Sequence, residues 1–343
     1  MSSLGSLGQV KLIRYLQLAV TKKLRPPLAC KGLEATARKA SSLTYCGISG
    51  KAVPRNYSGK KNGGLKPPKI ETLDVGDVCS DGRIIVIGDV HGCCGELLDL
   101  LEKCDRRTQD LVIFVGDLVN KGPDSARVLA EARRIGALAV LGNHDAAALQ
   151  AYEKWLANPS IALAPKYQWV EELCPEDVAW LRACPLSLAI PFHDALVVHA
   201  GLVPGLPLKK QSRKNMYKIR DVVPDGSGWA AVKKGGLGPP GRAFPWASRW
   251  QGPQHIIFGH DARRLLQRYT YATGLDTACV YGGELTACIL PSVNDLRTSG
   301  MRSDPAMWQF VAVKACDVYQ EPIEPVIHGK RQQEGMQSWL WEL

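Results

Sequence analysis

In the stretch Ile84-Ile85-Val86-Ile87-Gly88-Asp89-Val90-His91-Gly92, four β-branched apolar residues come first. The segment that follows them contains two glycines, an aspartate and a histidine. Such a short apolar run before a glycine is typical of a buried strand that ends in a sharp turn. In open α/β sheets ligands bind at the carboxyl ends of strands. Asp89 and His91 therefore lie where a functional site is expected.

The same pattern returns twice downstream. Residues 111–116 and 138–142 are apolar runs that end in glycine and are followed by Asp117 and Asn143. Helix-like stretches at residues 96–104 and 125–135 separate the three runs, and this alternation predicts βαβ units and a parallel sheet.

The remaining segments predict further elements. Residues 146–184, with Trp155, Trp169 and Trp180, favour a helical insert, and residues 226–250 favour a Gly/Pro-rich loop. Further strands are expected at residues 186–191, 195–199, 256–259, 278–281, 285–290 and 308–313.

The formal net charge of +10 is unevenly distributed. Residues 1–70 hold 14 basic residues and one acid, so this Ser-rich leader carries +13 and the other 273 residues carry −3. Its composition is typical of a transit peptide, which would direct the protein to a chloroplast or mitochondrion. The alternative is a disordered basic tail on a cytoplasmic protein. We expect one domain at residues 71–320 and a tail at residues 321–343.

Bulk features exclude several classes of protein. No apolar run reaches the roughly 18–20 residues that span a bilayer, so no membrane association is expected. The 11 cysteines contain no C-x-x-C pair, which favours reduced thiols over a disulfide framework or a thiolate zinc site.

Metal-ligand residue types gather at five strand ends. Asp and His side chains suit divalent transition metals, and a run of five such ends predicts a metal site. The residues are Asp89, His91, Asp117, Asn143, His144, Asp145, His199 and His260.

These segments resemble the calcineurin-like metallophosphoesterases, whose pattern is G-D-x-H-G, G-D-x-V-D-R-G, G-N-H-D/E, H-A/G-G and G-H. Residues 84–291 carry the match, and residues 116–125, 258–262 and 273–277 resemble the ApaH-like phosphatase branch. The resemblance implies a four-layer α/β/β/α sandwich with a helical insert near residues 146–184.

The resemblance also implies two divalent metal ions, drawn from Mn, Zn, Co, Fe or Mg. By position, Asp89 and His91 hold the first, Asp117 bridges, and Asn143, His199 and His260 hold the second. Two such cations lower the pKa of a bridging water to about 7. The resulting hydroxide would attack phosphorus. His144 would act as the general acid, with Asp145 and Asn120 as further catalytic residues.

Two positions depart from the family pattern, because Asn120-Lys121-Gly122 stands where most members have D-R-G. We expect the amide oxygen of Asn120 to accept the hydrogen bond that orients the His144 ring, without the charge that would stabilise an imidazolium. Lys121 keeps a positive charge but loses the bidentate fork of arginine. Both changes argue against a phosphoprotein phosphatase.

The expected substrate site is a basic strip at residues 209–250, which holds ten basic and two acidic residues. Its side chains would attract a phosphate chain, although a solvated helix face is the alternative. Predicted substrate contacts are Lys121, Arg213, Asn215 and Arg220. Trp229, Trp246 and Trp250 either stack a nucleobase or pin the loop onto the core.

The sequence therefore predicts hydrolysis of a phosphoanhydride. Inorganic polyphosphate ranks first, a dinucleoside polyphosphate second and capped RNA third. The acidic body argues against a stable nucleic-acid partner apart from a capped RNA end. A scaffold without activity would lack metal ligands, and none is missing. The sequence leaves the oligomeric state open.

Overall fold

The computed structural model describes residues 69–232, 241–300 and 303–322. The predicted basic leader, except its last two residues, and nearly all of the predicted C-terminal tail lie outside these ranges. Within them, no helix combines the length and apolar character needed to cross a membrane.

The first sheet has five strands in the order β14-β13-β2-β3-β4. The predicted βαβ units are confirmed, because β2, β3 and β4 run parallel and α2 and α3 connect them. Strands β13 and β14 extend the sheet antiparallel. The bounds are β2 Ile84–Ile87, α2 Cys94–Lys103, β3 Leu111–Phe114, α3 Ser125–Arg134, β4 Leu138–Ala139, β13 Glu284–Leu290 and β14 Gln309–Lys314.

The second sheet has six strands in the order β1-β5-β6-β10-β12-β11. Strands β5 and β6 form the expected antiparallel pair, and β10 runs parallel to both β6 and β12. The bounds are β1 Glu71–Thr72, β5 Ser187–Ile190, β6 Ala195–Val198, β10 His255–Phe258, β11 Gln267–Tyr269 and β12 Ala272–Gly274.

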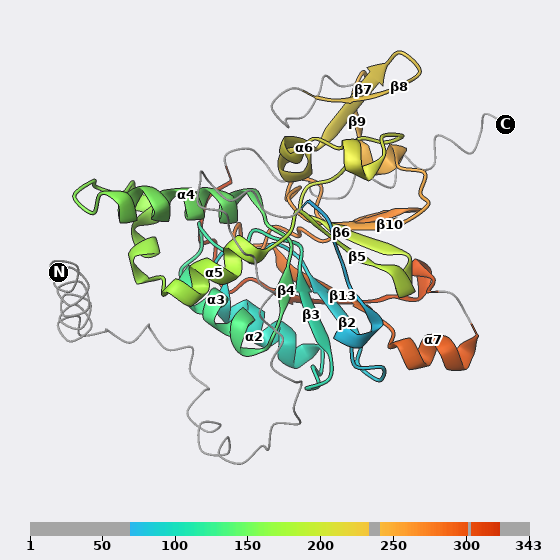
Figure 1. The fold of residues 1–343 in the computed structure, drawn as a ribbon, viewed down its shortest axis with the longest axis horizontal. Helices are drawn as coiled ribbons and strands as arrows, with labels where there is room; N and C mark the ends of the chain where they lie inside the picture. The colour runs from blue at the N-terminus through green and yellow to red at the C-terminus, as the bar shows by residue number, and fades with distance from the viewer. Residues whose placement is uncertain (1–68, 233–240, 301–302, 323–343) are drawn as a thin grey trace, which may run out of the picture. The chain divides into compact units, whose positions relative to one another are not determined.

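Successive residues of a strand point to opposite faces of its sheet. The residues that face inward from the two sheets form one shared apolar layer. Val86 and Ile113 of the first sheet are buried in one cluster with Val197 and Ile257 of the second. Ile85 and Ile87 face the other way and pack in a second cluster that includes residues of α2 and α3. Figure 1 shows α2 and α3 along the first sheet. The predicted α/β sandwich, with helices packed against the outer side of the first sheet, is confirmed.

The Trp-rich region forms three helical segments, of which the first contacts the other two and those two contact α3. They are α4 Asn143–Ala157, the 3-10 helix η2 Pro165–Glu172 and α5 Pro175–Ala183 (Figure 1). An ion pair of 2.6 Å between Arg133 and Asp177 ties α5 to α3. The helical insert is therefore anchored to the outer layer of the first sheet.

Two predictions about secondary structure were wrong. Residues 226–250 were expected to be loop, but this region contributes to a third sheet of order β8-β7-β9, which Figure 1 shows beside α6. Residues 278–281 were expected to be a strand, but they form turns with only isolated bridges at Ala278 and Tyr281. The bounds in the first region are α6 Arg213–Lys218, β7 Asp221–Asp225, β8 Gly228–Ala231, β9 Phe244–Pro245 and η6 Trp246–Arg249.

The outer face of the second sheet is covered by short segments. The buried Trp246 of η6 packs against Phe258 of β10, with ring centroids 4.9 Å apart. The other short elements are η1 Val75–Asp77, η3 Pro191–His193, η4 Leu208–Lys210, α7 Val293–Ser299 and η7 Pro305–Met307.

Candidate metal centre

The residues predicted as metal ligands converge where the carboxyl ends of the two sheets meet. Asp89 and His91 follow β2, Asp117 follows β3, Asn143 follows β4, His199 follows β6, and His260 follows β10. Two groups of three side chains can each offer ligand atoms to a metal, and within each group these atoms lie within 4.8 Å of one another. One group contains His91, Asp117 and His144, and the other contains Asp117, His199 and His260.

Asp117 is common to both groups. Its Oδ2 lies 3.6 Å from Nε2 of His91 and 3.5 Å from Nε2 of His199. The Asp117 carboxylate is therefore placed where two cations could share it, which is the role that the family resemblance implies.

Main-chain carbonyls fix the tautomers of these two histidines. Nδ1 of His91 lies 3.1 Å from the Val119 carbonyl oxygen, and Nδ1 of His199 lies 3.0 Å from that of Val115. A carbonyl can only accept, so each Nδ1 carries a proton, and in the neutral ring each Nε2 presents a lone pair. Both Nε2 atoms face Asp117, and this carbonyl-held arrangement is the usual one for metal-ligating histidines.

The amide of Asn143 completes the second group. One of its terminal atoms lies 2.9 Å from Nδ1 of His260, 3.2 Å from Nε2 of His199 and 3.2 Å from the Tyr217 carbonyl oxygen. These three acceptors favour the amide nitrogen at this position. A divalent cation would instead draw the amide oxygen toward it. The nitrogen and oxygen donors thus fit a divalent metal.

Asp89 stands beside two other buried carboxylates. Burial, then Asp276 and Asp117, raise the pKa of Asp89 well above its usual value, although the main-chain N–H of His260 donates to both of its oxygens at 3.1 Å. Concentrated buried negative charge of this kind favours a cation.

Asp276 is a member of this site that the sequence analysis missed. It is 5% exposed, and burial raises its pKa to about 6 although the Lys121 ammonium opposes the shift. The signal was present in the sequence, because Asp276 lies two residues after the glycine that ends β12, much as Asp89 lies one residue after the glycine that follows β2.

Two glycines make room for the carboxylates. A Cβ on Gly259 would lie 2.0 Å from Oδ1 of Asp89, and a Cβ on Gly142 would lie 2.2 Å from Oδ1 of Asp117. No side chain tolerates such an overlap. Gly259 therefore leaves room beside His260 for the Asp89 carboxylate, and Gly142 leaves room beside Asn143 for the Asp117 carboxylate.

Five of the predicted site residues have left-handed backbone. The φ angles are 47° for His91, 51° for Asp117, 69° for Asn120, 73° for Lys121 and 69° for His260. Positive φ is uncommon in residues other than glycine and costs about 1–3 kcal/mol where a side chain is held there. The surrounding fold therefore imposes the loop shapes that aim these side chains.

His144 lies beside the first group, with its ring centroid 4.9 Å from that of His91. Burial lowers the pKa of the His144 imidazole to about 4, while Asp117 acts in the opposite direction. Since Asn120 lacks a charge that would stabilise an imidazolium, a lowered pKa was expected for His144. The direction agrees, but burial is the main cause.

The expected contact between Asn120 and the His144 ring is wrong. Oδ1 of Asn120 accepts a hydrogen bond of 2.9 Å from the indole N–H of Trp169, and Nδ2 donates to the main-chain oxygen of His144 at 2.9 Å. Asn120 therefore holds the main chain of His144, and its amide oxygen is taken by the helical insert.

Lys121 lies inside the site. Its Nζ is 2.7 Å from Nε2 of His91 and 5.1 Å from the centroid of the Tyr281 ring. The ammonium therefore lies against a predicted metal ligand, and its charge opposes the rise in the pKa values of Asp276 and Asp89.

Asp145 supports the loop of the shared ligand. Its fully buried carboxylate accepts hydrogen bonds from the N–H groups of Asp117 and Gly142 at 2.8 and 3.0 Å, and from those of Leu118 and Val119 at 2.9 and 3.3 Å. These contacts make Asp145 a positioning residue for Asp117.

The other predicted substrate residues lie on segments that contact the second group. Arg213 and Asn215 lie on α6, the helix whose Tyr217 carbonyl faces Asn143. Arg220 donates to the main-chain oxygen of His260 at 2.9 Å and lies 3.6 Å from Asp261.

Arg264 is half-buried and shares the Asp261 carboxylate with Arg220. Arg264 bridges Asp261 and Asp221 at 2.6 and 2.7 Å. Burial would lower the pKa of the Arg264 guanidinium, but the charges of both carboxylates outweigh it and raise that pKa.

The three tryptophans of the basic strip have separate environments. The indole of Trp246 is buried and donates to the Ala200 carbonyl at 3.0 Å, and that of Trp250 donates to Gln254 at 2.9 Å. Trp229 packs edge-on against Phe244, and the Arg249 guanidinium lies over both rings. Trp246 and Trp250 therefore pin the loop to the core.

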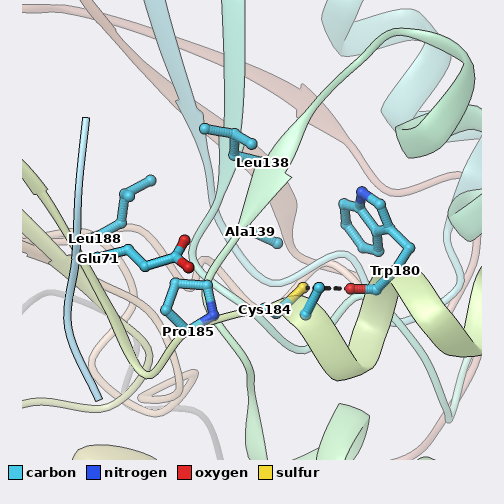
Figure 2. A pocket seen from close by; sticks show the side chains of 8 residues that line it. Glu71, Leu138, Ala139, Trp180, Cys184, Pro185 and Leu188 are labelled. Carbon is cyan, nitrogen blue, oxygen red and sulfur yellow. Dashed lines mark hydrogen bonds between the residues drawn. The ribbon is translucent and has the colours of Figure 1, made fainter. Parts of the chain in front are cut away.

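A pocket elsewhere in the fold does not belong to this site. Figure 2 shows it between β4, β5 and α5, lined by Glu71, Leu138, Trp180, Cys184 and Leu188 among others. None of its lining residues is a predicted ligand or catalytic group, and its walls are mainly apolar.

Known proteins are similar to this chain in sequence. A symmetrical bis(5'-nucleosyl)-tetraphosphatase from Janthinobacterium sp. (strain Marseille) is 32% identical over 251 residues, which cover 59% of this chain and 90% of that protein. A serine/threonine-protein phosphatase 1 from Salmonella typhimurium (strain LT2) is 28% identical over 222 residues, covering 60% of this chain and 90% of that protein.

A crystal structure described provisionally as a diadenosine tetraphosphatase has a TM-score of 0.59 and 34% identity, covering 73% of this chain and 99% of that one. Residues 82–264 match the family described as calcineurin-like phosphoesterase, a span that includes every predicted metal ligand. The site and its relatives identify a metal-dependent phosphatase, and the chain belongs to the calcineurin-like phosphoesterase family.

Proposed function

We propose that this protein hydrolyses dinucleoside polyphosphates, and that it splits diadenosine tetraphosphate at its central P–O–P bond. The pair of donor groups that share Asp117 carries the proposal, because one shared carboxylate between two cation sites suits phosphoryl chemistry. Relatives named symmetrical bis(5'-nucleosyl)-tetraphosphatase, aligned over about 90% of their length, support this substrate class.

In this proposal Asp89, His91 and Asp117 hold one divalent cation, and Asp117, Asn143, His199 and His260 hold the other. When bound, the two ions supply Lewis acidity and an activated water at neutral pH. The protein's own contribution is to hold the donors in place, through the carbonyls that fix His91 and His199 and through the carboxylate of Asp145.

The reaction consumes one water molecule. A new P–O bond forms at one central phosphorus as the central P–O–P bond breaks, so diadenosine tetraphosphate yields two molecules of ADP. The departing diphosphate oxygen takes up a proton, which we assign to the imidazolium form of His144, a member of the first donor group. Burial lowers the pKa of this ring to about 4, and the negative charge of a bound phosphate chain would favour its protonated form.

Cationic side chains surround the place where the phosphate chain would lie. Lys121 lies within the first donor group, and Arg220 lies beside His260 of the second. Arg213 on α6 is one helical turn before Tyr217, whose carbonyl faces Asn143. A linear tetraphosphate can therefore meet positive charge on both sides of the bond that breaks.

Inorganic polyphosphate ranks first on the sequence alone, but no contact of the described residues singles it out, and the relatives support the dinucleoside class. A phosphoprotein phosphatase also occurs among the relatives. The test must therefore compare these substrates directly.

The deciding experiment is a panel of diadenosine tetraphosphate, inorganic polyphosphate, capped RNA and a phosphopeptide, each with Mn²⁺, Zn²⁺, Co²⁺, Fe²⁺ and Mg²⁺. The proposal expects the highest kcat/KM for diadenosine tetraphosphate with ADP as the only nucleotide product. A mixture of AMP and ATP would contradict central cleavage, and a higher kcat/KM for any other substrate would contradict the substrate class. Asp117→Asn, assayed beside the wild type, controls for contaminating phosphatases.

A further inference from the structure

We infer that Trp169, in the helical insert, is a positioning residue for His144 and acts through Asn120. The inference rests on the proposed function in one respect, namely that His144 delivers a proton to the leaving group. The indole N–H of Trp169 donates to Oδ1 of Asn120 at 2.9 Å, and Nδ2 of Asn120 donates to the His144 carbonyl at 2.9 Å.

These two contacts require an amide at position 120. One neighbour, the indole N–H, can only donate, and the other, a main-chain carbonyl, can only accept. An amide offers an acceptor and a donor on the same planar group, so both contacts are satisfied in a single orientation. An ionised aspartate would place an oxygen 2.9 Å from the His144 carbonyl oxygen and would lose that hydrogen bond.

The hydrogen bond from Asn120 gives the main chain of His144 a second anchor. The His144 N–H donates to Oδ1 of Asp117 at 2.8 Å, and the carbonyl of the same residue accepts from Asn120. Asn120 is itself held by its N–H, which donates to the Ser125 hydroxyl at 2.9 Å. The peptide groups on both sides of the His144 side chain are thus anchored, one to the shared metal ligand and one to the insert.

The insert brings Trp169 to this place through η2. The Trp169 N–H also contacts the Lys166 carbonyl at 3.1 Å, so the turn of η2 and the Asn120 amide hold the indole from two directions. The residue is only half-buried, and 49 positions separate it from Asn120. The insert therefore influences the predicted general acid without reaching the phosphorus.

The test is the leaving-group dependence of turnover in Trp169→Phe, which keeps an aromatic ring and removes the donor. Aryl phosphates from p-nitrophenyl to phenyl make the test independent of the natural substrate. Poor leaving groups need the proton most, so we expect kcat for phenyl phosphate to fall about 10-fold and kcat for p-nitrophenyl phosphate to change less than about twofold. Trp180→Phe, in the same insert, should leave both rates unchanged.

Asn120→Asp and Asn120→Ala test the same connection and serve if Trp169→Phe does not fold. Both should reproduce the selective loss with bound metal unchanged. Combining Trp169→Phe with Asn120→Ala should add little, because residues in one hydrogen-bonded path are not additive.

Equal losses for all aryl phosphates, or no loss in either Trp169→Phe or the Asn120 variants, would overturn the inference. If the wild type cleaves aryl phosphates but not diadenosine tetraphosphate, the proposed substrate fails, and the leaving-group comparison still decides the role of Trp169.

Discussion

The main-chain N–H of His144 donates a hydrogen bond of 2.8 Å to Oδ1 of Asp117, so the predicted general acid is bonded directly to the predicted bridging ligand. The other carboxylate oxygen, Oδ2, is the one that faces His91 and His199. A change at Asp117 should therefore disturb both the metal sites and the placement of His144.

Asp117→Asn should abolish hydrolysis and reduce metal content. The amide keeps the shape of the side chain but removes the negative charge that both donor groups share. Elemental analysis of purified protein and circular dichroism measure the metal content and the fold. Asp99→Asn, on the exposed face of α2, is the matched control and should change neither. Full activity in Asp117→Asn would refute the shared-ligand assignment.

His144→Asn should lower kcat for diadenosine tetraphosphate by about 10²–10⁴-fold, the usual contribution of a general acid, with both metal ions retained. The loss should shrink for substrates whose leaving group is stable as an anion. Steady-state kinetics with a leaving-group series checks this. An unchanged rate for a poor leaving group would remove His144 from the acid role.

Removal of metal with a chelator should lower the melting temperature as well as the activity. The folded protein binds the cations and the unfolded chain lacks the assembled site, so adding Mn²⁺ back should raise the melting temperature with its concentration. Asp117→Asn should show a much smaller rise. If the melting temperature of chelator-treated wild-type protein does not change when Mn²⁺ or Zn²⁺ is added, this would argue against a bound metal in this fold.

Asp110, away from the metal centre, should make stability fall in acid. Burial opposes ionisation of its carboxyl, but hydrogen bonds from Arg83 and Arg107 prevail and lower its pKa from 3.8 to about 2. A lowered folded pKa gives stability that is complete above the unfolded pKa and is lost as the pH falls through the folded one, here between about pH 4 and pH 2.

The shift corresponds to roughly 2 kcal/mol. Urea unfolding of wild type and Asp110→Asn should therefore differ by about that amount at pH 6 and by progressively less toward pH 3. A difference that stays constant across this range would show that ionisation of Asp110 does not stabilise the fold.

The strand ends of the site could be predicted because each combines an apolar run, a glycine and a polar residue within a few positions. Local patterns of that kind identify β2, β3, β6 and β10 and the side chains that follow them. The fold then brings these ends together, because parallel strands present their carboxyl ends at one edge.

The parts that could not be predicted depend on contacts between distant segments. The third sheet lies in a Gly/Pro-rich stretch with no regular apolar alternation, so its short strands gave no period-2 signal. The partner of Asn120 lies in an insert whose helical turns could be expected but whose placement could not. Residues 278–281 are apolar like a strand, yet the isolated bridges at Ala278 and Tyr281 do not extend into a ladder.

The positive φ angles at His91, Asp117, Asn120, Lys121 and His260 have a consequence for protein engineering. Copying the ligand residues into another scaffold would transfer the donor atoms but not the left-handed turns that aim them, because those turns are unfavourable unless surrounding structure enforces them. A working transplant would need the two sheet edges and the glycines opposite Asp89 and Asp117 as well. The smallest portable unit of this centre is therefore the sandwich itself.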